Sequence, residues 1–86
     1  MTYGIIFADG WEHHFSALDN SVKRNILHKI EQMREKPPGR HLRFGTDFFV
    51  EEMGQCRILY VVDGNLKVIY FAGTHKDYER YIGLRK

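Results

Sequence analysis

The hydrophobic residues of this 86-residue chain recur with two periods, one typical of strands and one typical of helices. The short apolar run at 3–8 (YGIIFA) is rich in β-branched and aromatic residues and predicts a buried strand. Three later segments carry a strand signal, at 47–53 (DFFVEEM), 56–63 (CRILYVVD) and 66–73 (LKVIYFAG). The glycine-containing pairs at 54–55 and 64–65 suit tight hairpin turns, so we expect these three strands to form an antiparallel meander.

Helical spacing occupies the region between the first strand and the meander. Asp9 and Glu12 stand at capping-box spacing, and apolar residues follow at helical intervals, which predicts a short first helix capped by Asp9. A second helix is expected to begin at the cap oxygens of 19–21. Its apolar stripe consists of Val22, Ile26, Leu27, Ile30 and Met33. Pro37 and Pro38 should end it, because the first lacks a backbone N–H and both restrict the preceding residue.

The order of these elements predicts an α+β fold in a single domain that spans residues 1–86. In this fold the helical hairpin packs on one face of the sheet, and the N-terminal strand is added to the three-stranded meander. The polar end of the chain, after the last strand, is expected to form about one helical turn.

Cysteine and histidine usage and the absence of long apolar runs indicate the cellular compartment and argue against a metal site. A single cysteine, Cys56, permits no internal disulfide, no signal peptide precedes Tyr3, and no apolar run approaches the roughly 20 residues that cross a membrane, so we expect a cytoplasmic protein with no membrane contact. Alternation places Cys56 with Ile58 in the core. The adjacent His13 and His14 would point about 100° apart on a helix, and His28 and His41 have no partner at ligand spacing, so no metal or other cofactor is expected.

The net charge of +2, from 13 basic and 11 acidic residues, is too small to indicate a free-standing nucleic-acid binder. Cations nevertheless gather at 36–43 (KPPGRHLR) and near the C-terminus. If these two groups adjoin in space, they would suit a phosphate-bearing partner.

Hairpin geometry brings polar residues from distant positions to one end of the sheet. A turn at 54–55 places Glu52 opposite Arg57, although a slip of one residue would place Glu51 there, so both carboxylates remain candidates. A turn at 64–65 places Arg57 opposite about Ala72. His75 then follows about three residues later, within about 10 Å at roughly 3.3 Å per residue.

A carboxylate, a guanidinium and an imidazole are suited to cutting RNA without a metal. Glu51 or Glu52 would take the proton of the 2′-hydroxyl, Arg57 would stabilise charge on the phosphate, and His75 would protonate the departing 5′-oxygen. Tyr81 would position the RNA. The other residues expected to contact RNA are Arg40, Arg43, Lys76, Tyr78 and Arg80.

Structural roles for the same residues remain open on spacing alone. A Glu and an Arg placed like Glu52 and Arg57 are more often a surface ion pair, and a histidine at a strand end, such as His75, is more often a loop residue than a catalyst. Tyr78 and Tyr81 stand at helical spacing, so they would also anchor the C-terminal segment to the sheet.

The chain resembles toxins of the RelE/ParE superfamily, which belong to type II toxin–antitoxin pairs. The resemblance covers nearly the whole chain and rests on its middle and end: Leu42-Arg43, the strand with Arg57, Ile58 and Tyr60, and Gly73-x-His75 followed by Tyr81. It implies a microbial RNase-like fold, and for the RelE branch a metal-independent endoribonuclease that cuts messenger RNA in the ribosomal A site. It also implies that Arg57 is the phosphate-stabilising arginine, His75 the acid and Glu51 or Glu52 the base. Where the best-known branch has a lysine pair, this chain has 50–52 (VEE).

The resemblance implies three partners: a cognate antitoxin, the ribosome and its messenger RNA. Apolar residues on an open face of the sheet are candidates for the antitoxin contact, namely Leu59, Val61 and Tyr70. Two alternatives come from other classes. One is a ParE-like toxin that inhibits DNA gyrase, and the other is a degenerate homologue that only binds a partner protein.

Overall fold

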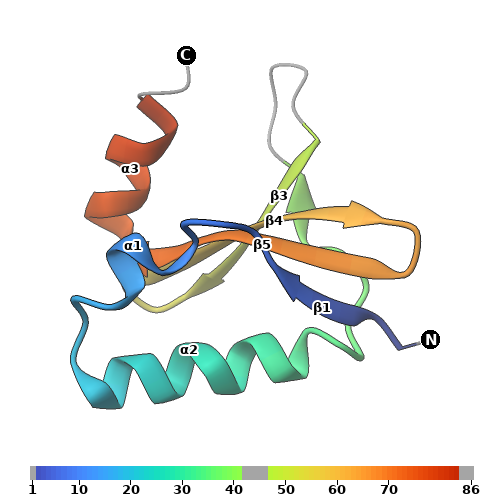
Figure 1. Cartoon of the computed structure of the whole chain (residues 1–86), viewed down its shortest axis with the longest axis horizontal. Helices are drawn as coiled ribbons and strands as arrows, with labels where there is room; N and C mark the ends of the chain where they lie inside the picture. Colours follow the sequence, from blue (N-terminus) through green and yellow to red (C-terminus); the bar gives the residue numbers. More distant parts are fainter. Residues whose placement is uncertain (1, 42–46, 84–86) are drawn as a thin grey trace.

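A five-stranded sheet forms the middle layer of the molecule, with a long helix on one face and the C-terminal helix on the other (Figure 1). The structure is a computed structural model that describes residues 2–41 and 47–83. In chain order the elements are β1 (Gly4–Phe7), α1 (Glu12–Phe15), α2 (Asn20–Gln32), β2 (Arg40–His41), β3 (Phe48–Met53), β4 (Cys56–Asp63), β5 (Leu66–Thr74) and α3 (His75–Gly83). None of the helices within the described ranges is long and apolar enough to cross a membrane.

The sheet has the strand order β1-β5-β4-β3-β2, in which β1 runs parallel to β5 and every other pair is antiparallel. The α+β prediction is therefore confirmed, including the meander of β3, β4 and β5 and the addition of β1 to its edge. The short strand β2 was not predicted, because its two residues lie in a segment that carries turn signals and little apolar character.

Two clusters of buried side chains hold the helices to the two faces of the sheet. On the first face, Ile26 and Ile30 of α2 and Met33 just after it pack on strand residues that include Cys56 and Ile58. On the second face, Tyr78 of α3 packs on Val50, Leu59 and Phe71. Cys56 lies in the α2-side core as predicted, and burial raises the pKa of its thiol.

The C-terminal helix is longer than the single turn that was expected. It spans nine residues, because Tyr78 and Tyr81 give it an apolar side that packs on Phe71, with ring centroids 6.0 and 5.0 Å away. A chain end with few apolar residues carries little helical signal by itself. The sheet face supplies the surface on which this helix is stable.

The start of the first helix differs from the prediction. The chain turns at Gly10, whose φ is 83°, and α1 begins only at Glu12 with Trp11 in the cap position, so Asp9 does not cap it. Apolar stacking holds this short helix, since the Trp11 ring lies 4.4 Å from the ring of Phe7 and 4.7 Å from that of Phe15. Asp19 does occupy the cap position of α2, but its side chain makes no capping hydrogen bond.

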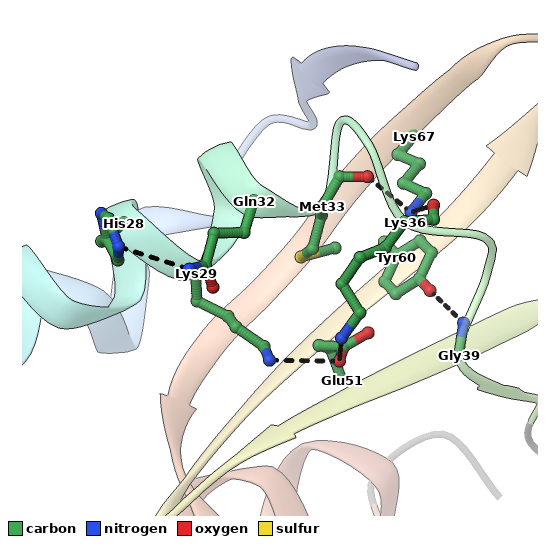
Figure 2. A network of polar contacts seen from close by, with 9 residues as sticks. All are labelled: His28, Lys29, Gln32, Met33, Lys36, Gly39, Glu51, Tyr60 and Lys67. Atoms are coloured by element: carbon green, nitrogen blue, oxygen red, sulfur yellow. Dashed lines mark hydrogen bonds and ion pairs between the residues drawn. The ribbon is translucent and has the colours of Figure 1, made fainter. Parts of the chain in front are cut away.

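The second helix ends at Gln32, well before the prolines that were expected to end it. Beyond it the backbone forms hydrogen bonds of the 3₁₀ type, in which an amide donates to the carbonyl three residues earlier. The amide of Arg34 donates to Glu31 O at 3.2 Å, and that of Lys36 donates to Met33 O at 3.4 Å. Two carbonyls of this segment also accept hydrogen bonds from a lysine. Lys67 Nζ donates to Met33 O and to Lys36 O, each at 2.8 Å (Figure 2).

Lys67 is fully buried, and the groups around its ammonium stabilise a positive charge. Its ammonium lies 4.6 Å from the centre of the Tyr3 ring and 5.3 Å from that of Tyr60, in addition to the two carbonyls. Burial lowers the pKa of Lys67, while the nearby charge of Glu51 raises it. The Tyr60 hydroxyl in turn accepts a hydrogen bond from the amide of Gly39 at 2.7 Å, so the chain after α2 is attached to the sheet at two places.

We expect Lys67→Met to lower the free energy of unfolding by about 2 kcal/mol. Two carbonyls lose a buried charged donor, which costs about 1–3 kcal/mol each, and relief of the buried ammonium offsets part of this loss. Urea denaturation measures the change. Lys76→Met is the control, because Lys76 is exposed and its substitution should cost under about 0.5 kcal/mol. Equal stability of the two variants would contradict a structural role for the Lys67 ammonium.

Candidate active site

The β3–β4 hairpin places Glu52 and Arg57 side by side. Its turn has two residues, with Gly54 at φ 56°, so that Met53 pairs with Cys56 and Glu52 with Arg57. The predicted register is therefore confirmed. Because opposed residues project from the same face, Arg57 Nε lies 3.8 Å from Glu52 Oε2.

The guanidinium of Arg57 is held above this hairpin turn. Its Nη1 donates to Gly54 O at 3.1 Å and to Cys56 O at 2.9 Å, and only 15 % of the side chain is exposed. A guanidinium has five N–H donors, so these contacts leave others for an anion. The backbone thus positions the cation before any ligand arrives.

The neighbour of Arg57 on β5 is Gly73, one residue beyond the predicted Ala72. A register shift between Leu59 and Tyr60 causes the difference: Leu59 pairs with Phe71 and Tyr60 with Ile69, so Tyr70 is an extra residue on β5. Space at Gly73 is limited, since a Cβ there would lie 3.0 Å from Phe71 Cζ and 3.2 Å from His14 Cβ.

His75 begins α3 at the same end of the sheet. Its backbone N–H donates to Gln55 O at 2.7 Å, which ties the start of the helix to the hairpin turn. Its imidazole is 48 % exposed, with Nε2 3.4 Å from Glu79 Oε2 and the ring stacked on Tyr78 at 6.4 Å. Arg57 and His75 are therefore attached to consecutive turn carbonyls, those of Gly54 and Gln55.

A hollow of about 480 Å³ lies beside His75, and we call it the α3 hollow. Its lining residues are Gln55, Thr74, His75, Lys76 and Glu79. Glu52 and Arg57 are not part of this lining. The hydroxyl of Thr74 accepts from the amide of Asp77 at 3.2 Å, which supports the first turn of α3.

Glu51 lies on the other face of the sheet and does not face Arg57. It pairs with Ile58, is only 8 % exposed, and binds Lys36 Nζ at 2.9 Å and Lys29 Nζ at 3.5 Å (Figure 2). Its hydrogen bond raises the pKa of Lys36. Strand alternation decides between the two candidate carboxylates, since consecutive residues point to opposite faces.

The two tyrosines of α3 both contact the sheet. Tyr78 is buried, and its ring packs against those of Phe71 and His75. Tyr81 is half-buried, and its ring packs against that of Phe71. The anchoring role that their spacing predicts is thus present. The burial of Tyr78 leaves little of its ring for a nucleobase.

The remaining predicted contacts are spread over the molecule. Lys76 and Arg80 are exposed on α3. Arg40 pairs with Val50 at the β2 edge of the sheet, and Arg43 lies outside the described residues. Of the apolar residues expected on an open face, Leu59 is buried beneath α3, while Val61 and Tyr70 are half-buried.

Sequence reasoning missed the partners of the two histidines near α3. Glu79 lies four residues after His75, a helical spacing that would have indicated the pair had a helix been expected there. His14 Nδ1 lies 3.7 Å from Asp77 Oδ2, and its ring lies 5.3 Å from that of Phe71. No sequence signal marks this second contact, because it joins α1 to α3.

Solved structures with a similar fold include two bacterial toxins and a chain of a toxin–antitoxin complex. No protein-family profile and no curated protein matches the chain. A chain of the toxin–antitoxin complex RelBE2 from Mycobacterium tuberculosis superposes with a TM-score of 0.79 at 18 % identity, over 87 % of this chain and 100 % of that one. A mutant of the Escherichia coli toxin RelE in the free state gives 0.75 at 19 % identity, over 95 % and 93 %.

A copper-bound mutant toxin from Helicobacter pylori is more distant, with a TM-score of 0.57 at 14 % identity, over 90 % of this chain and 98 % of that one. These similarities cover nearly the whole chain. The chain therefore has the fold of the RelE-like toxins.

We expect Glu51→Gln to lower the free energy of unfolding by about 2–3 kcal/mol, because two lysines lose a buried carboxylate. Glu52→Gln is the matched control and should stay within about 0.5 kcal/mol, since the Glu52 side chain is 46 % exposed. The Glu51–Lys36 contribution should be fully present below the ordinary lysine pKa of 10.5 and should be lost as the pH rises past the raised pKa of Lys36. Urea titrations across pH measure both effects. Equal losses for the two glutamates would contradict the assignment.

Proposed function

We propose that this chain is the toxin of a toxin–antitoxin pair and that it cleaves messenger RNA on the ribosome without a metal ion. The observation that carries the proposal is the attachment of Arg57 and His75 to consecutive carbonyls of one hairpin turn. The RelE-like fold supports it. A cytoplasmic location follows from the proposed substrate.

The proposed reaction is an attack by the ribose 2′-oxygen on the adjacent phosphorus. Glu52 takes the 2′-hydroxyl proton, and Arg57 stabilises the negative charge that gathers on the phosphate oxygens. The P–O5′ bond breaks as His75 gives a proton to the 5′-oxygen. The products are a 2′,3′-cyclic phosphate and a 5′-hydroxyl, with no net gain or loss of protons.

The surroundings of the three residues suit these roles. Glu52 lies 3.8 Å from Arg57 Nε, and this contact keeps the carboxylate beside the cation. The imidazole of His75 is half exposed, so an RNA strand reaches it from solvent. Lys76 and Arg80 are exposed on the same helix, where they would bind phosphates, and Tyr81 would position the strand from the edge of α3.

We expect Arg57→Ala and His75→Ala each to lower messenger cleavage by about 10²-fold or more, as loss of a charge-stabilising group or a general acid does. Primer extension on a reporter messenger after brief induction measures the cuts. His13→Ala and Arg24→Ala are matched controls, because both side chains are exposed on other helices.

Intact messenger with the wild-type protein would overturn the nuclease proposal. Inhibition of gyrase supercoiling would then indicate the ParE-like mode. Neither effect, with tight binding to the product of a neighbouring reading frame, would indicate a partner-only protein.

A row of partly exposed apolar residues, among those that the structure describes, supports a protein partner on the α3 face of the sheet. Four residues that pair successively across the strands share this face beyond α3, namely Ile6, Val68, Val61 and Phe48. Ile6 is 46 % exposed, and Tyr70 extends the row through its contact with Phe48 at 5.4 Å. One of the structurally similar chains comes from a toxin–antitoxin complex, and we propose that the antitoxin covers this row.

We expect Ile6→Lys to weaken antitoxin binding at least tenfold while the protein stays folded, because an exposed side chain contributes little to the core. Leu27→Lys is the matched control, since Leu27 is 45 % exposed but lies on α2, across the sheet. Calorimetric titration with the co-encoded antitoxin measures both. Equal affinities of the two variants would show that the antitoxin binds elsewhere.

A further inference from the structure

A second hollow, of about 530 Å³, lies between α2 and the β3–β4 hairpin, and we call it the α2 hollow. Gln55 lines both the α2 hollow and the α3 hollow. The two depressions therefore adjoin at the hairpin turn.

Side-chain amides are concentrated in this second hollow. The whole chain contains five Asn and Gln residues, and three of them, Asn25, Gln32 and Gln55, line it. Asn25 and Gln32 stand seven residues apart on α2, which is close to two helical turns and places them on the same side. Gln55 lines it from the hairpin.

These amides are available to a ligand. Among the residues that the structure describes, the side-chain amides of Asn25 and Gln55 make no hydrogen bond. Gln32 Nε2 lies 3.4 Å from His28 Nε2, a contact in which the amide donates and the imidazole accepts. Each amide group offers a donor and an acceptor side by side.

The rest of the α2 hollow combines apolar side chains with those of His28 and Lys29. Val22, Met53 and Cys56 contribute apolar or sulfur-bearing side chains, and the raised pKa of Cys56 keeps its thiol neutral. None of the described lining residues is acidic. Lys29 supplies a positive charge, but its ammonium lies 3.5 Å from Glu51.

This chemistry fits a nucleobase better than a phosphate. A base has flat apolar faces and an edge on which donors and acceptors alternate, and Asn and Gln side chains match such an edge with paired hydrogen bonds. A phosphate would require free cations, and the lysine here is already paired with a carboxylate.

We propose that the α2 hollow is a subsite for an unpaired RNA base adjacent to the cleaved phosphate, and that Asn25, Gln32 and Gln55 select which base it accepts. This proposal rests on the proposed nuclease function and adds its sequence preference. Gln55 links the subsite to the reaction, because its carbonyl holds the backbone of His75 at 2.7 Å.

Nuclear magnetic resonance tests the subsite without any variant. Hexaribonucleotides of uridine, adenosine or cytidine are titrated into the isotope-labelled protein, and the five side-chain amide signals are followed. We expect the signals of Asn25, Gln32 and Gln55 to shift with one base more than with the others. Those of Asn20 and Asn65 should stay in place, because neither residue lines the hollow.

Shifts confined to the α3 hollow, or equal shifts with every base, would overturn the proposal. Amides that respond to the antitoxin and to no oligonucleotide would identify the hollow as a protein-docking surface and would overturn it as well.

A cleavage assay separates this proposal from the nuclease function on which it rests. The double variant N25A/Q32A should still cut reporter messenger but with a base preference beside the cut that is weakened at least tenfold, the effect of losing one or both amide–base contacts. Asn20→Ala is the matched control. Thermal unfolding confirms that each variant is folded.

Cleavage with an unchanged base preference would overturn the subsite and leave the nuclease function standing. Absence of any cleavage by the wild-type protein would instead remove the proposed function, and the subsite with it.

Discussion

The buried ammonium of Lys67 determines how the helical and strand parts of this protein fit together. It lies at the C-terminal end of α2, where the last carbonyls of a helix carry partial negative charge, and it binds Met33 O and Lys36 O at 2.8 Å each. Local backbone amides end the helix, and a lysine on β5 additionally binds the chain just beyond it. The chain leaves α2 at this point and returns to the sheet at β2 and β3.

The same region couples two lysines to one carboxylate. Lys36 gives its carbonyl to Lys67 and its ammonium to Glu51, and Lys29 of α2 approaches Glu51 as well. The contacts extend from the helix to two strands of the sheet (Figure 2). Removal of one member would leave charged or polar groups buried without a partner, which is why such networks stabilise one particular arrangement.

The hairpin turn at Gly54 and Gln55 organises the candidate site in a comparable way. One carbonyl of the turn holds the Arg57 guanidinium, the next holds the start of α3, and the Gln55 side chain lies where the two hollows meet. A tight turn has few conformations, so the groups bound to it are fixed relative to one another. Consecutive residues of a strand point to opposite faces of the sheet. Glu52 of β3 therefore lies beside Arg57, whereas the adjacent Glu51 binds Lys36 on the opposite face.

Local sequence determined the four longer strands, the two tight turns and the pairing of Glu52 with Arg57, because short apolar or alternating runs mark strands and a two-residue loop fixes their register. Tertiary structure decided the rest. The extra residue Tyr70 moved the partner of Arg57 to Gly73, and the sheet face extended α3. The contact of Lys67 with α2 spans more than thirty positions, so no local pattern marks it. These features depend on which surfaces meet after folding, and the periodicity of a single segment carries no information about its eventual neighbour.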